Sequence, residues 1–164
     1  MQHRTLTLNY LELDSPSDLP AQDLELLHSA RNAAIDAYAP YSGFRVGAAV
    51  LLDDGTVVKG NNQENAAFPS GLCAERVALF AAAAQYPAQK VVAIAITAIS
   101  REGEINEPIP PCGACRQVMQ ETESRTGQSL RVIMAGNAGK VIILDSAANL
   151  LPFAFTFKIS PNES

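Results

Sequence analysis

Residues 73–99 read CAERVALFAAAAQYPAQKVVAIAITAI, a helical segment followed closely by a strand. Alanine-rich Cys73 to Tyr86 has high helical propensity and ends at Pro87. The run from Val91 to Ile99 is continuously apolar, which is typical of a strand covered on both faces. This stretch therefore predicts a layered α/β/α domain.

The same alternation of helices and strands extends in both directions from this stretch. Further helices are predicted at residues 20–38, 112–125 and 145–150, and further strands at 5–13, 46–52, 56–60, 130–134 and 140–144. Ser17 or Asp18 is expected to cap the first helix, and Pro40 to stop it. Asp53-Asp54-Gly55 predicts a tight hairpin turn, because Asp-Gly accepts positive φ values. The sheet is thus expected to be mixed, antiparallel at the hairpin and parallel where helices cross over.

Composition and charge limit the classes of function. The chain has 164 residues, of which 48% are hydrophobic and 18% charged, which suits one packed domain; we expect it at residues 20–160, after an N-terminal extension at 1–19. Seventeen acidic against twelve basic residues give a net charge of -5, which disfavours a nucleic-acid partner. No apolar run is long enough for a membrane helix, and the alternating N-terminus does not resemble a secretory signal. We therefore expect a cytoplasmic protein without a membrane partner.

All three cysteines lie at predicted helix starts. Cys73 opens one helix, and Cys112 and Cys115 lie at the start of another. Helix N-termini lower thiol pKa values, so these cysteines are candidate thiolate ligands of zinc. Three ligands leave the fourth tetrahedral position open, as in catalytic zinc sites. His3 and His28 lie far upstream without ligand spacing, and we interpret them as solvated or core-edge residues.

Glu75 lies two residues after Cys73. Considered alone, it is a carboxylate at a helix start, where it interacts favourably with the helix macrodipole. Next to a catalytic zinc it becomes a candidate catalytic residue, because hydrolysis needs a group that takes a proton from water.

Cys73-Ala74-Glu75 together with Pro111-Cys-Gly-Ala-Cys-Arg-Gln117 resembles the all-cysteine zinc motif of the cytidine deaminases. The resemblance continues through residues 38–49, 62–65 and 150–155. It implies a zinc enzyme of pyrimidine nucleoside salvage, which hydrolyses cytidine and 2′-deoxycytidine to uridine and 2′-deoxyuridine with release of ammonia. It also implies a cytoplasmic homotetramer in which neighbouring subunits complete each site.

The resemblance also implies roles for individual residues. Hydroxide formed on zinc would attack C4 of the base, while Glu75 would carry the proton to N3 and a second proton would reach the departing amino group. The other roles are ribose binding by Asn62 and Glu64, contact with the pyrimidine by Phe44, contact with the amino group by the Ala74 backbone, covering of a neighbour's substrate by Phe155, and a hydrogen bond to a cysteine ligand by Arg76.

Each of these residues also has a simpler interpretation. Asn62 could be a turn residue, Glu64 a solvated charge, Phe44 part of the core and Arg76 a surface charge. Phe155 alternates with Phe153 and Phe157 as in a strand and could belong to a C-terminal core.

This sequence departs from the family pattern in two places. It has the extension at residues 1–19, and it reads Asn61-Asn-Gln-Glu64 where many members have Cys-Asn-Ile-Glu. Neither departure touches a proposed catalytic group.

Three other functions share part of this pattern. A nucleic-acid editing enzyme would use the same zinc chemistry, but the acidic charge and the Asn62 and Glu64 motif disfavour phosphates. A zinc-stabilised binding module would need neither Glu75 nor an open ligand position. A deaminase of antibiotic nucleosides would differ in substrate alone.

Overall fold

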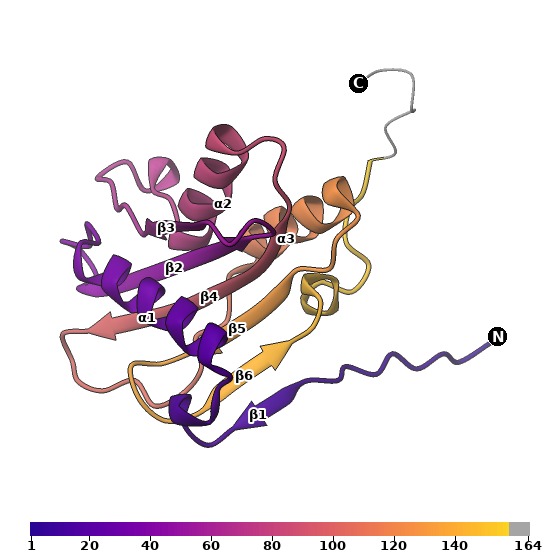
Figure 1. Ribbon diagram of the computed structural model, residues 1–164, viewed down its shortest axis with the longest axis horizontal. Helices are drawn as coiled ribbons and strands as arrows, with labels where there is room; N and C mark the ends of the chain where they lie inside the picture. Colours follow the sequence, from indigo (N-terminus) through magenta and orange to yellow (C-terminus); the bar gives the residue numbers. More distant parts are fainter. Residues whose placement is uncertain (158–164) are drawn as a thin grey trace.

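A single six-stranded sheet forms the centre of the protein. The computed structural model describes residues 1–157, so the end of the predicted domain at residue 160 lies outside the described residues. The sheet has the order β1-β6-β5-β4-β2-β3, parallel between β4 and β5 and antiparallel elsewhere (Figure 1). Its strands are β1 (Leu11–Leu13), β2 (Phe44–Leu52), β3 (Val57–Asn61), β4 (Val91–Ser100), β5 (Arg131–Ala135) and β6 (Val141–Leu144). The predicted mixed sheet is confirmed.

Helices cover both faces of the sheet. The helices are α1 (Ala21–Ile35), α2 (Ala74–Gln85) and α3 (Gly113–Thr126). Buried side chains of α1 pack in one core cluster, and those of α2 and α3 in the other. β4 contributes side chains to both clusters. Ile94 and Ile96 lie on the side of α2 and α3, whereas Ala93 and Ala95 lie on the side of α1. The predicted α/β/α layering is therefore confirmed.

The hairpin and the helix ends near the cysteines follow the sequence prediction. β2 and β3 pair from Gly47↔Asn61 to Leu51↔Val57, and Gly55 has a φ of 88° in the turn. Gly127 ends α3 in the left-handed conformation, with a φ of 64°. These local signals are strong because only glycine adopts such φ values at little cost.

Several predicted boundaries are wrong at the N-terminal half. The first helix begins after Pro20, which has no side-chain capping bond, and stops at Ile35 instead of Tyr38. Ser17 and Asp18 are not its caps, because a separate short 3-10 helix, Pro16–Asp18, intervenes and is capped by Ser15. Of the predicted strand at 5–13, only Leu11–Leu13 pairs with β6. The extension thus contributes an edge strand to the sheet.

Three further segments differ in part from the sequence-based expectation, two in the C-terminal half and one before α2. The predicted helix at 145–150 is a 3-10 turn, Ala147–Leu150, capped by the Ser146 hydroxyl. A strand through Phe153 to Phe157 is absent, because Phe153 has a φ of 57°, which interrupts an extended backbone. The loop predicted at 61–71 contains a 3-10 turn, Phe68–Ser70.

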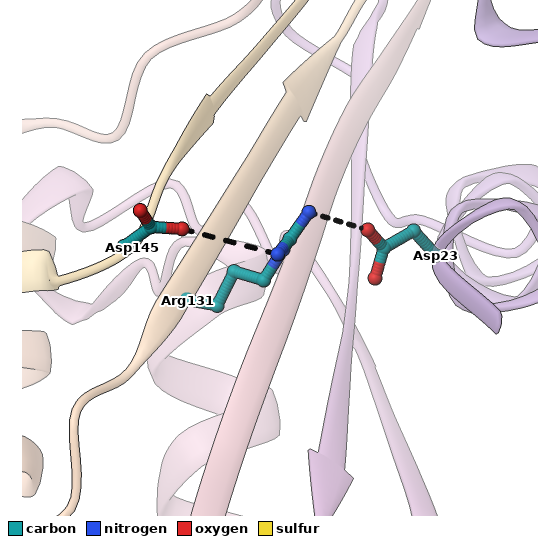
Figure 2. A network of polar contacts seen from close by, with 3 residues as sticks. All are labelled: Asp23, Arg131 and Asp145. Atoms are coloured by element: carbon teal, nitrogen blue, oxygen red, sulfur yellow. Dashed lines mark hydrogen bonds and ion pairs between the residues drawn. The ribbon is translucent and has the colours of Figure 1, made fainter. Parts of the chain in front are cut away.

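An arginine links α1 to the sheet (Figure 2). Arg131, at the start of β5, pairs with Asp23 of α1 at 2.8 Å and with Asp145, just after β6, at 3.8 Å. This contact ties the helix on one face to two neighbouring strands.

None of the helices within residues 1–157 has the length and apolar character needed to cross a membrane.

Candidate metal and substrate site

The three cysteines meet where α2 and α3 begin. Cys73 is the N-cap of α2, Cys112 is the N-cap of α3, and Cys115 lies in the first turn of α3. Their sulfur atoms are 3.8 Å apart for Cys73 and Cys112 and 3.4 Å apart for Cys112 and Cys115, and all lie within 4.8 Å of one another. Zn–S bonds of about 2.3 Å in a tetrahedron place sulfur atoms about 3.8 Å apart, so the donor set fits zinc.

Hydrogen bonding between the thiols shifts the pKa values of Cys73 and Cys115 in opposite directions. The pKa of Cys73 is lowered to about 5, because its sulfur accepts hydrogen bonds from the Cys115 thiol and from Arg76. The same sulfur contact, together with burial, raises the pKa of Cys115. A bound zinc ion would favour ionisation of all three thiols.

Arg76 lies directly beside this cluster. Its Nη2 atom is 3.8 Å from the Cys73 sulfur, and this contact raises the pKa of the guanidinium. Arg76 is therefore placed to offset the negative charge that three thiolates leave on a zinc dication.

Glu75 projects from the first turn of α2 into the same region. Glu75 is only 4% exposed, and it is one of the residues that line the cavity described below. Burial raises the pKa of the carboxyl group, and the nearby Cys73 thiolate raises it further. A buried carboxyl with a raised pKa beside a metal site is suited to take up and release a proton near neutral pH.

His3 and His28 take no part in this site. Both are exposed, and the metal-ligand cluster found among the described residues consists of the three cysteines. Their exposure agrees with the interpretation of both histidines as solvated residues.

A cavity of about 730 Å³ opens beside the cysteines. Its lining brings together the predicted residues Phe44, Asn62, Glu64, Glu75 and Arg76, which come from β2, the loop after β3, and α2. The cavity therefore joins the metal ligands to the candidate substrate residues in one space. Its lining also includes residues to which sequence reasoning assigned no role: Tyr41, Ser42, Phe68, Ile109 and Pro110.

Asn62 uses its side chain to hold the beginning of β2. Its Oδ1 atom accepts a hydrogen bond from the Val46 amide at 2.7 Å, and its Nδ2 atom donates to the Phe44 carbonyl at 3.0 Å. These bonds fix the backbone that carries Phe44. Oδ1 keeps a second lone pair for another donor.

Glu64 is held by the loop before β2. Its Oε2 atom accepts hydrogen bonds from the backbone amides of Tyr41 and Ser42 at 2.8 and 3.3 Å. Its Oε1 atom accepts one from the Ser42 hydroxyl at 2.5 Å. The Ser42 hydroxyl, together with the amides, holds the pKa of this carboxyl below its usual range. Glu64 is therefore an ordered carboxylate at neutral pH.

Phe44 and Ala74 occupy different environments. Phe44 is half-buried and lines the cavity instead of belonging to either core cluster. Ala74 is fully buried in the core cluster with α2 and is not among the residues that line the cavity, so the structure does not bring it together with the other predicted substrate residues.

Phe155 is not among the residues that line the cavity of its own chain. Phe153, Phe155 and Phe157 are 100%, 74% and 79% exposed, so the interpretation as a C-terminal core is wrong. The carbonyl of Phe155 accepts a hydrogen bond from Gln117 of α3 at 2.8 Å, which fixes this part of the tail on the surface.

The fold and the three-thiol site together define an α/β protein with a zinc-binding centre. Residues 20–128 match the family model described as the cytidine and deoxycytidylate deaminase zinc-binding region. The chain is 44% identical over 131 residues to the cytidine deaminase of Halalkalibacterium halodurans, covering 80% of this chain and 92% of that protein.

Solved structures agree with this similarity. The cytidine deaminase from Burkholderia pseudomallei has a TM-score of 0.69 and 44% identity, covering 80% of this chain and 97% of that one. The cytidine deaminase from Mycobacterium tuberculosis has a TM-score of 0.61 and 33% identity, covering 81% and 96%. The chain belongs to the cytidine deaminase family, and zinc is the metal of its three-cysteine site.

Proposed function

We propose that this chain is a zinc-dependent hydrolase that converts cytidine and 2′-deoxycytidine to uridine and 2′-deoxyuridine with release of ammonia. The observation that carries the proposal is the buried Glu75 carboxyl beside three clustered thiols, of which Cys73 and Cys112 line the same cavity as Glu75. Similarity to cytidine deaminases supports the same reaction. We further propose that residues 20–160 form the catalytic domain, and that the reaction serves pyrimidine nucleoside salvage.

Glu75 is the proposed proton carrier. Cys73, Cys112 and Cys115 would hold zinc, which supplies an activated water when it is bound. The Glu75 carboxylate would take a proton from this water and deliver it to N3 of the pyrimidine, and a further proton would reach the departing amino group. Its burial supports this role, because a raised pKa brings the acid and base forms closer in energy at neutral pH.

The remaining cavity residues would orient the nucleoside. Phe44 would lie against the pyrimidine, Asn62 and Glu64 would bind a ribose hydroxyl, and the Ala74 backbone would contact the amino group. Two carboxylates, Glu64 and Glu75, line the cavity, whereas Arg76 is the one guanidinium among the described lining residues and already contacts Cys73. This charge balance favours a nucleoside over a nucleotide, whose phosphate would be repelled.

A homotetramer is part of the proposal. The exposed Phe155 would cover the substrate of a neighbouring subunit, since it is not among the residues that line its own cavity. Assembly would then be required for a complete substrate site.

The test follows the ultraviolet spectrum of cytidine with zinc-loaded protein, and compares Glu75→Ala with the exposed control Glu121→Ala. We expect conversion to uridine by the wild type and by Glu121→Ala, and loss of turnover by at least about a hundredfold in Glu75→Ala with its zinc content unchanged. Near-normal turnover by Glu75→Ala would refute its assigned role.

Further substrates separate the alternatives. Cytidine 5′-monophosphate should react poorly. Binding of single-stranded RNA at physiological salt would favour a nucleic-acid editing enzyme. A folded, zinc-loaded wild type that is inactive on cytidine but active on a modified nucleoside would favour the antibiotic-nucleoside alternative. If it is inactive on all of them and unfolds when zinc is removed, a zinc-stabilised binding module would be favoured.

A further inference from the structure

The Glu64 carboxylate has almost no free hydrogen-bonding capacity. A carboxylate has about four lone-pair sites. Two donors, the Tyr41 and Ser42 amides, reach Oε2, and one donor, the Ser42 hydroxyl, reaches Oε1. One acceptor site therefore remains, on Oε1, for a group inside the cavity.

The Ser42 hydroxyl connects this oxygen to the base side of the cavity. It donates to Glu64 Oε1 at 2.5 Å and accepts from the Phe44 amide at 3.0 Å. The connection runs from the Phe44 backbone through one hydroxyl to the Glu64 carboxylate. The distance between the aromatic ring and the carboxylate is thus set in part by a single side chain.

The turn that carries Ser42 is itself constrained. Gly43 has a φ of 68°, and its amide donates to the Ala39 carbonyl at 3.0 Å. The positive φ favours glycine at this position, whereas the atoms nearest to an added Cβ belong to the flexible side chain of Arg101. The Glu64 backbone amide donates to the Tyr38 carbonyl at 2.8 Å, which joins the two loops a second time.

We propose that Ser42 is a positioning residue for sugar recognition, which directs the one open acceptor site of Glu64 toward a ribose hydroxyl at a fixed distance from Phe44. This inference rests on the proposed nucleoside deaminase function. Ser42 acts through Glu64 and need not itself contact the substrate. In this arrangement the hydroxyl of a neutral sugar donates a hydrogen bond to the ordered Glu64 carboxylate.

The experiment compares steady-state kinetics of zinc-loaded wild type, Ser42→Ala and Ser42→Thr. The control is Ser70→Ala, at an exposed serine in the 3-10 turn Phe68–Ser70. The substrates are cytidine and 2′,3′-dideoxycytidine, which lacks both ring hydroxyls. For Ser42→Ala we expect the KM of cytidine to rise about tenfold with kcat changed less than about twofold, because the loss is one charge-assisted hydrogen bond.

The two substrates distinguish positioning from a general effect on the loop. We expect the KM of dideoxycytidine to be the same in Ser42→Ala and wild type, and Ser42→Thr to restore the KM of cytidine, since threonine keeps the hydroxyl. An equal rise in KM for both substrates, or no rise for cytidine, would overturn the role of Ser42 while the deaminase function stands. A zinc-loaded wild type with no turnover of either nucleoside would instead overturn the deaminase function, and the role of Ser42 with it.

Discussion

Gly60 of β3 lies directly against the backbone of Ala78 in α2. A Cβ at Gly60 would lie 2.4 Å from the Ala78 amide nitrogen and 2.6 Å from the Ala74 carbonyl oxygen. No side chain separates the strand from the helix at this point, so the helix that carries Cys73 and Glu75 is fixed at contact distance from the sheet. The position of the metal site relative to the substrate loop after β3 depends on this contact.

Gly60→Ala is therefore expected to destabilise the fold. The added methyl group meets backbone atoms that cannot move away, so the free energy of unfolding should fall by about 1–3 kcal/mol, measured by urea denaturation of the zinc-loaded protein. Gly113→Ala is the control, since a Cβ there meets nothing within 4 Å. Equal stability of Gly60→Ala and wild type would contradict the contact.

Replacing Cys115 tests the metal site. Cys115 is fully buried and its sulfur lies 3.4 Å from that of Cys112. We expect Cys115→Ala to lose zinc during dialysis, because two thiolates do not suffice for a structural or catalytic zinc site. Metal analysis by mass spectrometry provides the measurement. Retention of one zinc per chain would exclude Cys115 from the ligand set.

Replacing Arg76 tests its role beside the ligands. Arg76→Gln removes the positive charge 3.8 Å from the Cys73 sulfur, so zinc affinity should fall by about 10–100-fold in competition with a chromophoric chelator. Arg125→Gln, an exposed substitution near the end of α3, serves as the control. Equal affinities of the two variants would leave Arg76 as an ordinary helix charge.

The two ion pairs of Arg131 in Figure 2 are expected to contribute unequally to the free energy of unfolding. The Asp23 side chain is 13% exposed and 2.8 Å from Arg131, whereas that of Asp145 is 94% exposed and 3.8 Å away. Asp23→Asn should lower the free energy of unfolding by about 1–2 kcal/mol, and Asp145→Asn by less than about 0.5 kcal/mol. Similar losses in both variants would show that burial does not govern this network.

Phe155 tests the contribution of a second subunit. Phe155→Ala should raise the KM of cytidine without changing the molar mass in solution, which light scattering measures. Phe153→Ala is a matched control at a neighbouring exposed phenylalanine. An unchanged KM would remove Phe155 from the substrate site, and dissociation of the oligomer would make it an assembly residue.

Much of the fold could be predicted from local patterns. Cys73 to Tyr86 and Val91 to Ile99 identified a helix and a buried strand within one residue at each end, because propensity and continuous apolarity act locally. The hairpin at Gly55 and the helix end at Gly127 were equally clear, because glycine is required there by backbone sterics. The cap of α1 was assigned wrongly because Ser17 and Asp18 belong to an additional turn, Pro16–Asp18, and the helix ends at Ile35 instead of Tyr38.

The sequence by itself determined which groups are candidates for the chemistry: three cysteines at helix starts and a carboxylate two residues after the first. Their spacing reflects local helix geometry and ligand chemistry, so it can be read along the chain. Only the tertiary structure decided that Ser42 donates hydrogen bonds from its amide and its hydroxyl to Glu64, 22 residues away, and that Phe155 lies on the surface. Such contacts depend on how distant loops and the chain end pack, which no local propensity specifies.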